Sequence, residues 1–429
     1  MTDLHAELQR PGPDPPAARI VHTPWFDSLR PRLTEGNEVV LLESGREFFP
    51  RLIADVDSAQ REVYLETYIF ECDASGRPIA DALARAARRG VAVHVLLDGF
   101  GAHSFDPQTA QALAQAGAQV QVYRPGGGLL PLDRKRLRRM HRKIVVVDGA
   151  IGYVGGMNVL DDHNDPNHGP LEHPRLDYVV RCRGPIVPAM HLAVARLWWQ
   201  MVAVHTPLRV RREIARRQGL TALRPPRTLE SDATPAGTMR AMLVLRDNLR
   251  WRKRIESAYL LAIRQAQREI VIANAYFLPG VRFRRALIRA ARRGVKVRLL
   301  LQGRIEYALP HYATQALYDE LLREGIEIVE YHQSFMHAKV AVIDDWATVG
   351  SSNIDPYSLL LAREANVFVL DAGFAALLRS RLLAAMTRGG RRIELKQLQR
   401  RGWAVRLLHW SAIALVRLGT ALTGARGRY

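Results

Sequence analysis

The sequence predicts an α/β protein made of two related halves that build one site between them. Three observations carry this prediction. A short motif occurs twice, and the sequence around it repeats as well. A third is the alternation of apolar β-type runs with amphipathic helical segments, which is typical of a sheet covered by helices. At 429 residues, the chain is long enough for two such halves with a sizeable core.

The motif places His, Lys and Asp at relative positions 0, 2 and 7 in both copies. The two copies are His141, Lys143 and Asp148, and then His337, Lys339 and Asp344. A single histidine beside an apolar strand is usually a hydrogen-bonded core residue. Duplication with a lysine at the same offset instead favours one reactive site to which each half contributes a copy.

Strand parity separates the aspartates of the motif from the other two residues. Apolar runs follow both lysines, at 144–147 and 340–343, and predict buried strands. Residues two apart on a strand point to the same face, so each His shares a face with its Lys. Asp148 and Asp344 have the opposite parity and are expected to close the turn after the strand. We keep both among the candidate catalytic residues because they complete the motif.

The wider repeat sets the order of elements in each half. Residues 85–91 are identical to 289–295, and residues 59–62 are identical to 266–269. In each half we expect an amphipathic helix, an apolar strand, a second helix ending at a glycine, another strand, a third helix, a short strand and then the His-Lys strand. The expected positions are strands 63–70, 91–97, 270–277 and 295–301, glycines Gly90 and Gly294, and third helices 109–116 and 314–323.

Composition divides the chain into five segments. These are a Pro-rich, flexible segment (1–33), the first half (34–204), a basic and Pro-rich linker (205–240), the second half (241–386) and a basic amphipathic C-terminal segment (387–429). The first half carries eight extra residues in the Gly-rich, then basic, run 125–139 before His141. This run is expected to form either a flexible flap over an anionic ligand or a solvated surface loop.

The charge balance predicts a polyanionic partner. The chain has 62 Lys and Arg against 42 Asp and Glu, a net charge of +20, which favours nucleic acid or an anionic membrane surface. Its two cysteines indicate neither a disulfide framework nor a cysteine-based metal site, which fits a reducing compartment.

No signal peptide or membrane span is expected, because the start is polar and no uncharged apolar stretch is long enough. Residues 403–422 come closest to a span. Their Trp and Leu content, with basic residues along the segment, predicts either a helix lying in the membrane interface or a C-terminal helix packed on the core.

Two His-Lys pairs facing one pocket suit phosphodiester chemistry. One imidazole can attack phosphorus to form a phosphohistidine, while the other protonates the leaving alkoxide and later deprotonates the acceptor. Lys143 and Lys339 are expected to hold the non-bridging oxygens, with further hydrogen bonds from Asn158, Asn353 and Ser351. Such a site requires no metal ion and no cofactor.

An attacking imidazole needs a carboxylate behind it to fix its tautomer. Asp177 and Glu364 lie just before apolar strands at equivalent positions of the two halves, which favours this role over that of solvated strand ends. Glu66, inside the apolar run 63–70, is a third candidate and has no acidic counterpart in the second half.

The duplicated motif resembles the signature of the phospholipase D superfamily. It is carried by residues 141–148 and 155–158 in the first half, and by 346–356 and 364–367 in the second. Within the superfamily, residues 35–385 are similar to bacterial cardiolipin synthases of the B type. The chain departs from the usual pattern in one place: six residues separate the motif Asp from the turn glycine in the first copy but five in the second, which bears on where Ser351 and Asn353 lie.

This resemblance implies an αβαβα sandwich in each half, with the active site at the interface between them. It implies that His141 is the nucleophile and His337 the general acid and base. Glu364 would orient His141, and Asp177 would orient His337, each across the interface. The implied reaction passes a phosphatidyl group from one phosphatidylglycerol, through a phosphohistidine, to the glycerol hydroxyl of another, which gives cardiolipin.

Two alternatives use the same residues. A phospholipase D would hydrolyse the lipid to phosphatidic acid, and a metal-independent nuclease would act on DNA or RNA. Nucleic acid is the less favoured partner, because the basic residues lie within helices without interleaved aromatic side chains for stacking. We therefore expect anionic phospholipid substrates, contact with the membrane surface through the C-terminal segment and basic patches, and a peripheral location on the cytoplasmic face of the cell membrane.

Overall fold

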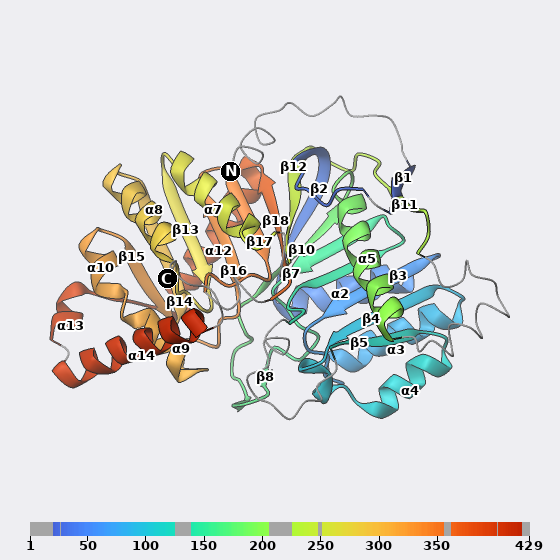
Figure 1. The fold of residues 1–429 in the computed structure, drawn as a ribbon, viewed down its shortest axis with the longest axis horizontal. Helices are drawn as coiled ribbons and strands as arrows, with labels where there is room; N and C mark the ends of the chain where they lie inside the picture. Colours follow the sequence, from blue (N-terminus) through green and yellow to red (C-terminus); the bar gives the residue numbers. More distant parts are fainter. Residues whose placement is uncertain are drawn as a thin grey trace.

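A mixed sheet of 15 strands runs through both halves of the molecule (Figure 1). The computed structural model describes residues 20–25, 27–124, 139–205, 225–247, 251–355, 362–400 and 402–422. The expected flap at 125–139 lies outside these ranges except for its last residue. The strand order is β19-β15-β14-β13-β16-β17-β18-β12-β2-β10-β7-β6-β3-β4-β5. The expectation of an α/β protein with two related halves is confirmed.

The first half follows the predicted order of elements. It consists of β2 (Thr34–Glu43), α2 (Ser44–Asp57), β3 (Glu62–Thr67), α3 (Gly76–Arg88), β4 (Ala92–Asp98), the short η1 (Gly101–Ser104), α4 (Pro107–Gln115), β5 (Gln119–Tyr123), β6 (Lys143–Val147), β7 (Ile151–Gly155), the small hairpin β8 (Asn164–Asp165) and β9 (Gly169–Pro170), β10 (Tyr178–Arg183) and α5 (Val187–His205).

The second half repeats this order. It consists of β12 (Met239–Arg246), α7 (Arg254–Gln265), β13 (Glu269–Asn274), α8 (Val281–Arg292), β14 (Lys296–Gln302), α9 (Ala308–Gln315), α10 (Tyr318–Arg323), β15 (Glu327–Tyr331), β16 (Lys339–Ile343), β17 (Trp346–Gly350), β18 (Glu364–Leu370) and α12 (Ala372–Gly389). Gly90 and Gly294 end the equivalent helices α3 and α8 with φ angles of 90° and 89°, a conformation that favours glycine.

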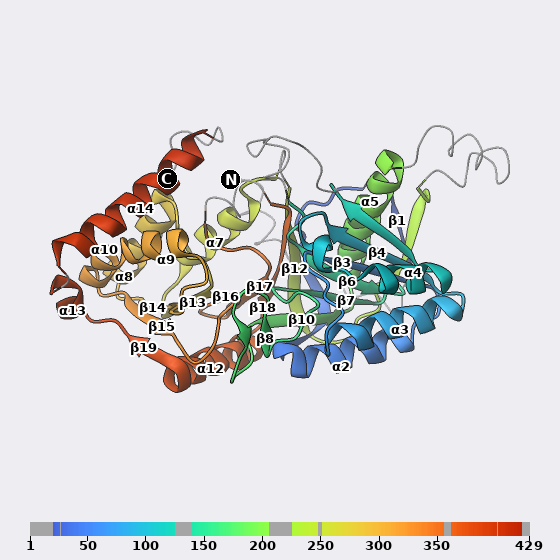
Figure 2. The same ribbon diagram turned by 90° about the horizontal axis from the view of Figure 1, so that it is seen from below.

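The two halves join edge to edge in the middle of the sheet. There β12 pairs with β2 in antiparallel fashion, with Met239 opposite Asn37 and Ala241 opposite Thr34. Helices α5 and α12 pack on one face of the sheet, and α2, α3, α7 and α8 pack on the other. Figure 2 shows helices on both sides of the sheet. Equivalent helices of the two halves therefore lie on the same face of the sheet, and strand ends of the two halves meet at the interface.

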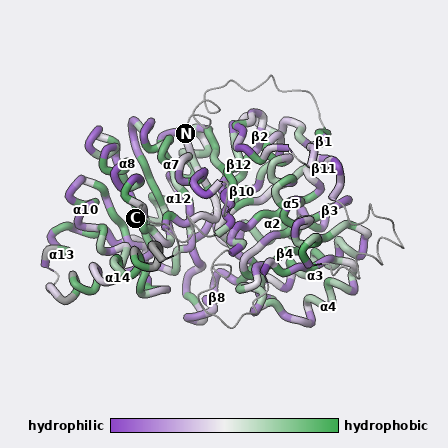
Figure 3. The backbone as a smooth tube through the Cα atoms, viewed as in Figure 1, coloured by the Kyte–Doolittle hydropathy of each residue, from purple (hydrophilic) through white to green (hydrophobic). Residues whose placement is uncertain are grey.

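The apolar strands form the core, and Figure 3 shows hydrophobic stretches along them in each half. One buried cluster lies beneath α5 in the first half and α12 in the second, and it spans the junction between them. Two others lie beneath α2 and α3 and beneath α7 and α8. Burial of these apolar faces is the main force that holds the helices on the sheet.

Both chain segments expected to be loosely structured contribute strands. Within the predicted flexible segment and linker, β1 (Ile20–Pro24) pairs with β11 (Thr228–Asp232) in a separate two-stranded sheet. Within the predicted C-terminal segment, β19 (Gly390–Arg392) extends the large sheet beside β15, and α13 (Leu395–Gln399) and α14 (Trp403–Leu422) follow. Sequence pattern alone missed these strands because their partners lie far away along the chain.

Candidate active site

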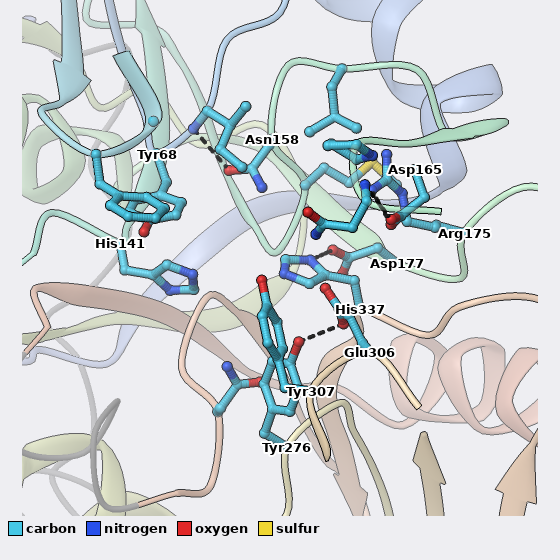
Figure 4. Close-up of a pocket in the computed structure, with 18 of the residues that line it drawn as sticks. Tyr68, His141, Asn158, Asp165, Arg175, Asp177, Tyr276, Glu306, Tyr307 and His337 are labelled. Atoms are coloured by element: carbon cyan, nitrogen blue, oxygen red, sulfur yellow. Dashed lines mark hydrogen bonds and ion pairs between the residues drawn. The ribbon is translucent and has the colours of Figure 1, made fainter. Parts of the chain in front are cut away.

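The two motif histidines face one pocket between the halves (Figure 4). Its volume is about 700 Å³, and both halves contribute lining residues. Loops at the ends of central strands form its walls, together with the hairpin β8–β9 and Val416 of α14. In the described part of the chain, no group of three or more His, Cys, Asp or Glu side chains is arranged to hold a metal ion.

Backbone bridges between the halves bring each histidine to its carboxylate. Met140, just before His141, pairs with Arg363, just before Glu364. The second copy repeats the arrangement, because Met336 pairs with Leu176, which precedes Asp177. The amide nitrogens of His141 and His337 donate to the carbonyls of Arg363 and Leu176 at 3.0 and 2.9 Å. Each half therefore supplies one histidine and the carboxylate for the other half's histidine.

The carboxylates bind the same ring nitrogen in both copies. His141 Nδ1 lies 3.0 Å from Glu364 Oε1, and His337 Nδ1 lies 2.7 Å from Asp177 Oδ2. Both carboxylates are buried, so each holds its imidazole with Nδ1 protonated and leaves Nε2 for the pocket. This is the geometry that a nucleophilic or proton-transferring histidine requires.

Burial dominates the electrostatics of the site. It lowers the pKa of His141, and it lowers that of His337 well below 6.5, with Lys143 and Lys339 acting in the same direction. Burial also raises the pKa of Asp177 to about 7, although Lys339 opposes it. For Glu364, burial alone would raise the pKa, but the neighbouring His141 and Lys143 outweigh it and the pKa falls. Burial in the pocket therefore favours neutral imidazoles.

The motif lysines are buried beside their histidines. Lys143 Nζ donates to the carbonyl of His141 at 2.7 Å, and Lys339 Nζ donates to that of His337. Burial lowers the pKa of Lys143 to about 7 and that of Lys339 to about 8, while Glu364 and Asp177 act against the shift. Two ammonium groups so close to one pocket create a site for an anion, and an anion there would in turn favour their charged forms.

The motif aspartates lie away from the pocket. The carboxylate of Asp148 accepts three backbone hydrogen bonds of 2.8–3.0 Å from residues 60–62. Asp344 accepts the equivalent three, also of 2.8–3.0 Å, from residues 267–269. Both residues have left-handed backbones, with φ angles of 53° and 52°. Placing Asp148 and Asp344 among the catalytic residues was therefore wrong. They anchor the turn after the His-Lys strand to the start of the neighbouring strand.

Ser351 does not reach into the pocket as expected. It is fully buried, and its hydroxyl donates to Glu364 Oε2 at 2.5 Å while accepting from the amide of Ala365. Asn158 and Asn353 do line the pocket, and Asn158 Oδ1 accepts from the amide of Ile69 at 3.3 Å. The expected contact of Ser351 with substrate oxygens is thus wrong, because its hydroxyl supports the carboxylate behind His141.

Glu66 also takes a different role from the one predicted. Its carboxylate forms a bidentate ion pair with Arg142, at 2.5 and 2.7 Å, and both side chains are buried. Arg142 further donates to the carbonyl of Ala193 on α5 at 2.9 Å. The suggestion that Glu66 orients a catalytic histidine is therefore wrong. The pair ties the beginning of β6 to β3 and α5.

Several residues around the histidines were not singled out from the sequence. Asp98 and Gln302 accept from the amides of Met140 and Met336, at 2.8 and 3.1 Å, and so fix the segment before each histidine. Tyr68 packs edge-on to His141, with ring centroids 5.0 Å apart. Asp98 and Gln302 could have been found from the sequence, because each is a polar residue at the equivalent place after an apolar strand of its half.

Comparisons with known proteins agree with this geometry. A protein-family model described as "Cardiolipin synthase, PLD-like domain" matches residues 52–168 and 259–385. Cardiolipin synthase B of Shigella flexneri is 37% identical over 379 residues, which cover 86% of this chain and 85% of that protein. The chain belongs to the cardiolipin synthase family of the phospholipase D superfamily. Its activity class is thus that of a phosphatidyltransferase.

Other members of the cardiolipin synthase family are more distant. The major cardiolipin synthase ClsA of Bacillus subtilis strain 168 is 31% identical over 346 residues, which cover 80% of this chain and 67% of that protein. Among solved structures, phosphatidylserine synthase from Haemophilus influenzae Rd KW20 superposes with a TM-score of 0.64 over 89% of this chain and 94% of that one, at 15% identity. This likeness shows that the two proteins share a fold.

Proposed function

We propose that the protein transfers a phosphatidyl group from one phosphatidylglycerol to the glycerol hydroxyl of a second, through a covalent phosphohistidine on His141. The observation that carries this proposal is the pair of histidines in one pocket, each held through Nδ1 by a buried carboxylate of the other half. One histidine can then act as nucleophile while the other moves the proton.

In the first step, Nε2 of His141 attacks phosphorus, and the bond from phosphorus to the leaving glycerol oxygen breaks. His337 gives its Nε2 proton to that oxygen, so phosphatidyl-His141 and a free glycerol form. Glu364 stabilises the positive charge that His141 acquires. Lys143 and Lys339 offset the charge on the non-bridging oxygens. The phosphodiester anion also favours the protonated form of His337 before the step.

In the second step, the glycerol hydroxyl of another phosphatidylglycerol loses its proton to His337 Nε2. Its oxygen attacks phosphorus, the bond to His141 breaks, and cardiolipin leaves. His337 ends the cycle protonated, as it began. Water in place of the lipid alcohol would give phosphatidic acid, so the fate of the intermediate decides between transfer and hydrolysis.

Lipid product analysis tests this reaction. Purified protein with phosphatidylglycerol vesicles should yield cardiolipin and glycerol, and His141→Ala and His337→Ala should each abolish both products. A matched variant, His163→Ala, changes an exposed histidine and should keep the activity. Accumulation of phosphatidic acid without cardiolipin would instead identify a phospholipase D. Absence of any lipid product would contradict both activities.

We further propose that α14 lies in the membrane interface on the cytoplasmic face. One side of the helix packs on the protein, with His409, Ala412, Ile413 and Val416 buried. The His409 ring stacks on Tyr312 of α9, with centroids 5.9 Å apart. The other side exposes large apolar residues, among them Trp403 and Trp410 at 79% and 65%, along with Val405, Leu407, Leu408, Leu415 and Leu418. Figure 3 shows hydrophobic stretches recurring along α14.

The packed side of α14 agrees with the expectation of a helix packed on the core, and its exposed apolar side supports the proposal of an interfacial helix. No helix in the described ranges is long and apolar enough to cross a membrane. Because Val416 lines the pocket, the helix runs beside its mouth. Phe100 and Tyr307, also exposed, stand on the pocket rim in the two halves. An apolar surface beside the opening, with a net charge of +20, favours docking on an anionic bilayer.

Vesicle sedimentation tests the membrane contact. Trp403→Ser with Trp410→Ser should lower binding to phosphatidylglycerol vesicles by about tenfold or more. Val204→Ser, which removes an equally exposed apolar side chain on α5 (71% exposed), should not. The wild type, the double variant and Val204→Ser should all keep their activity on dispersed short-chain lipid. Unchanged vesicle binding by the double variant would contradict this location of the membrane contact.

A further inference from the structure

Two equivalent loops that line the pocket differ at one position, where only the second carries a carboxylate. The loops that follow β4 and β14 are equivalent, because Gly99 and Gly303 donate to the carbonyls that end β5 and β15, at 2.8 and 2.9 Å. Three residues further on, the first half has Ala102 and the second has Glu306. Only the second-half loop therefore places a carboxylate at this position, on the same side of the pocket as His337 (Figure 4).

Glu306 is held in place but keeps an acceptor atom for a ligand. Tyr276 donates its hydroxyl to Glu306 Oε2 at 2.5 Å. Tyr307 lies beside Tyr276, with ring centroids 6.1 Å apart. Among the described residues, no hydrogen bond reaches Glu306 Oε1. Burial raises the pKa of Glu306, while Lys339 acts against that shift. Lys339 therefore lies close enough to interact electrostatically with this half-buried carboxylate.

The chemistry of a carboxylate limits what it can bind here. It repels phosphate oxygens, so it does not fit the donor phosphate that the two lysines attract. It accepts hydrogen bonds from hydroxyl or ammonium groups. Lys339 and Arg175 lie close enough to lower the pKa of Glu306, and these neighbouring cations disfavour an ammonium but not a neutral hydroxyl.

We propose that Glu306 binds a second hydroxyl of the acceptor polyol and so presents its primary hydroxyl to Nε2 of His337. This inference rests on the proposed function, since it assigns the acceptor side of the same pocket. A glycerol headgroup carries two adjacent hydroxyls, whereas water and simple alcohols have one. The Glu306 carboxylate only accepts a hydrogen bond, and the proton of the attacking hydroxyl passes to His337.

Acceptor competition on the phosphatidyl intermediate tests this role. Wild-type protein with phosphatidylglycerol and added isotope-labelled glycerol or ethanol should favour glycerol over ethanol per unit concentration. Glu306→Ala, which copies the first half, should reduce that preference about tenfold or more while phosphatidic acid formation is unchanged. The glycerol preference of Glu306→Gln, which keeps an oxygen acceptor, should lie between those of the wild type and Glu306→Ala. Tyr276→Phe should lose less of the glycerol preference than Glu306→Ala does.

A charge control completes the design. Glu320→Gln removes a carboxylate from α10 that pairs with Arg284 at the surface, and it should leave the preference intact. An unchanged glycerol preference in Glu306→Ala would overturn the inference, as would an equal loss of transfer and hydrolysis. A selective loss of transfer to ethanolamine would also overturn it, in favour of ammonium recognition. If the wild type gave no phosphatidyl product at all, the proposed function itself would fail.

Discussion

The two halves agree in backbone and differ in the side chains around the histidines. Each half has a left-handed Asp after its His-Lys strand, a polar anchor at the end of its third strand and a bridge to the opposite carboxylate. These features set where His141 and His337 lie. Because they come in pairs, the backbone frame alone does not tell the two histidines apart.

The differences between the halves lie in the residues that surround the histidines and their carboxylates. Ser351 supports Glu364 in the second half, whereas Gly156 occupies the equivalent place beside Asp177. The Glu66–Arg142 ion pair corresponds to Ala273 and Ala338. Glu306 corresponds to Ala102. A duplicated fold can thus keep one geometry for two histidines and assign them unequal roles through the residues behind them.

The largest effect should come from separating the two histidine roles. With phosphatidylglycerol, His141→Ala and His337→Ala should each lose about 10⁴-fold in rate. A donor with p-nitrophenol as leaving group needs no protonation, so His337→Ala should still release one equivalent of p-nitrophenol in a burst. His141→Ala should release none. A burst in His141→Ala and none in His337→Ala would reverse the assignment.

The next effect concerns stability, at the ion pair found only in the first half. Arg142→Ala leaves the Glu66 carboxylate buried without a partner and should cost about 3–5 kcal/mol of unfolding free energy. Replacing both, as Glu66→Leu with Arg142→Met, should recover most of that loss, because the second half packs apolar residues in this place. Denaturant unfolding measures both. Equal losses in the single and double variants would show that the ion pair itself is required.

A smaller effect should follow from removing the hydroxyl behind Glu364. Ser351→Ala deletes a hydrogen bond to a charged acceptor and should slow transfer by about tenfold. The converse change, Gly156→Ser, should slow transfer more than Ser351→Ala does. A Cβ at Gly156 would stand 2.3 Å from Asp177 Oδ1, so the carboxylate must move away from His337. Transfer rates for both variants test this ordering, and a faster Gly156→Ser than Ser351→Ala would refute it.

The sequence was sufficient wherever a feature depends on local pattern. The repeated order of strands and helices and the spacing of His141 and Lys143 are local, and so is the opposite parity of Asp148. Asp177 and Glu364 were recognisable because they occupy equivalent positions before apolar strands. These features predicted the two-half fold and most of the residues that the structure brings together.

Features that depend on pairing between distant segments were not predictable in this way. Glu66 meets Arg142 only because β3 pairs with β6, and an arginine between His and Lys carries no sign of burial. The direction of the Ser351 hydroxyl depends on the Glu364 position across the turn. The pairing of β1 with β11 joins segments about two hundred residues apart, whose Pro-rich neighbours indicate coil.

The smallest effect should distinguish the two lysines by pH. The pKa values of Lys143 and Lys339 are lowered to about 7 and about 8, so kcat/KM should fall as the pH rises through this range and each loses its proton. Lys143→Arg keeps a positive charge beside Lys339 and should leave a fall near pH 8, whereas Lys339→Arg should leave one near pH 7. Because the bound phosphodiester favours the charged lysines, kcat should fall at higher pH than kcat/KM. If both variants retained the wild-type profile, the titrating group would be neither lysine.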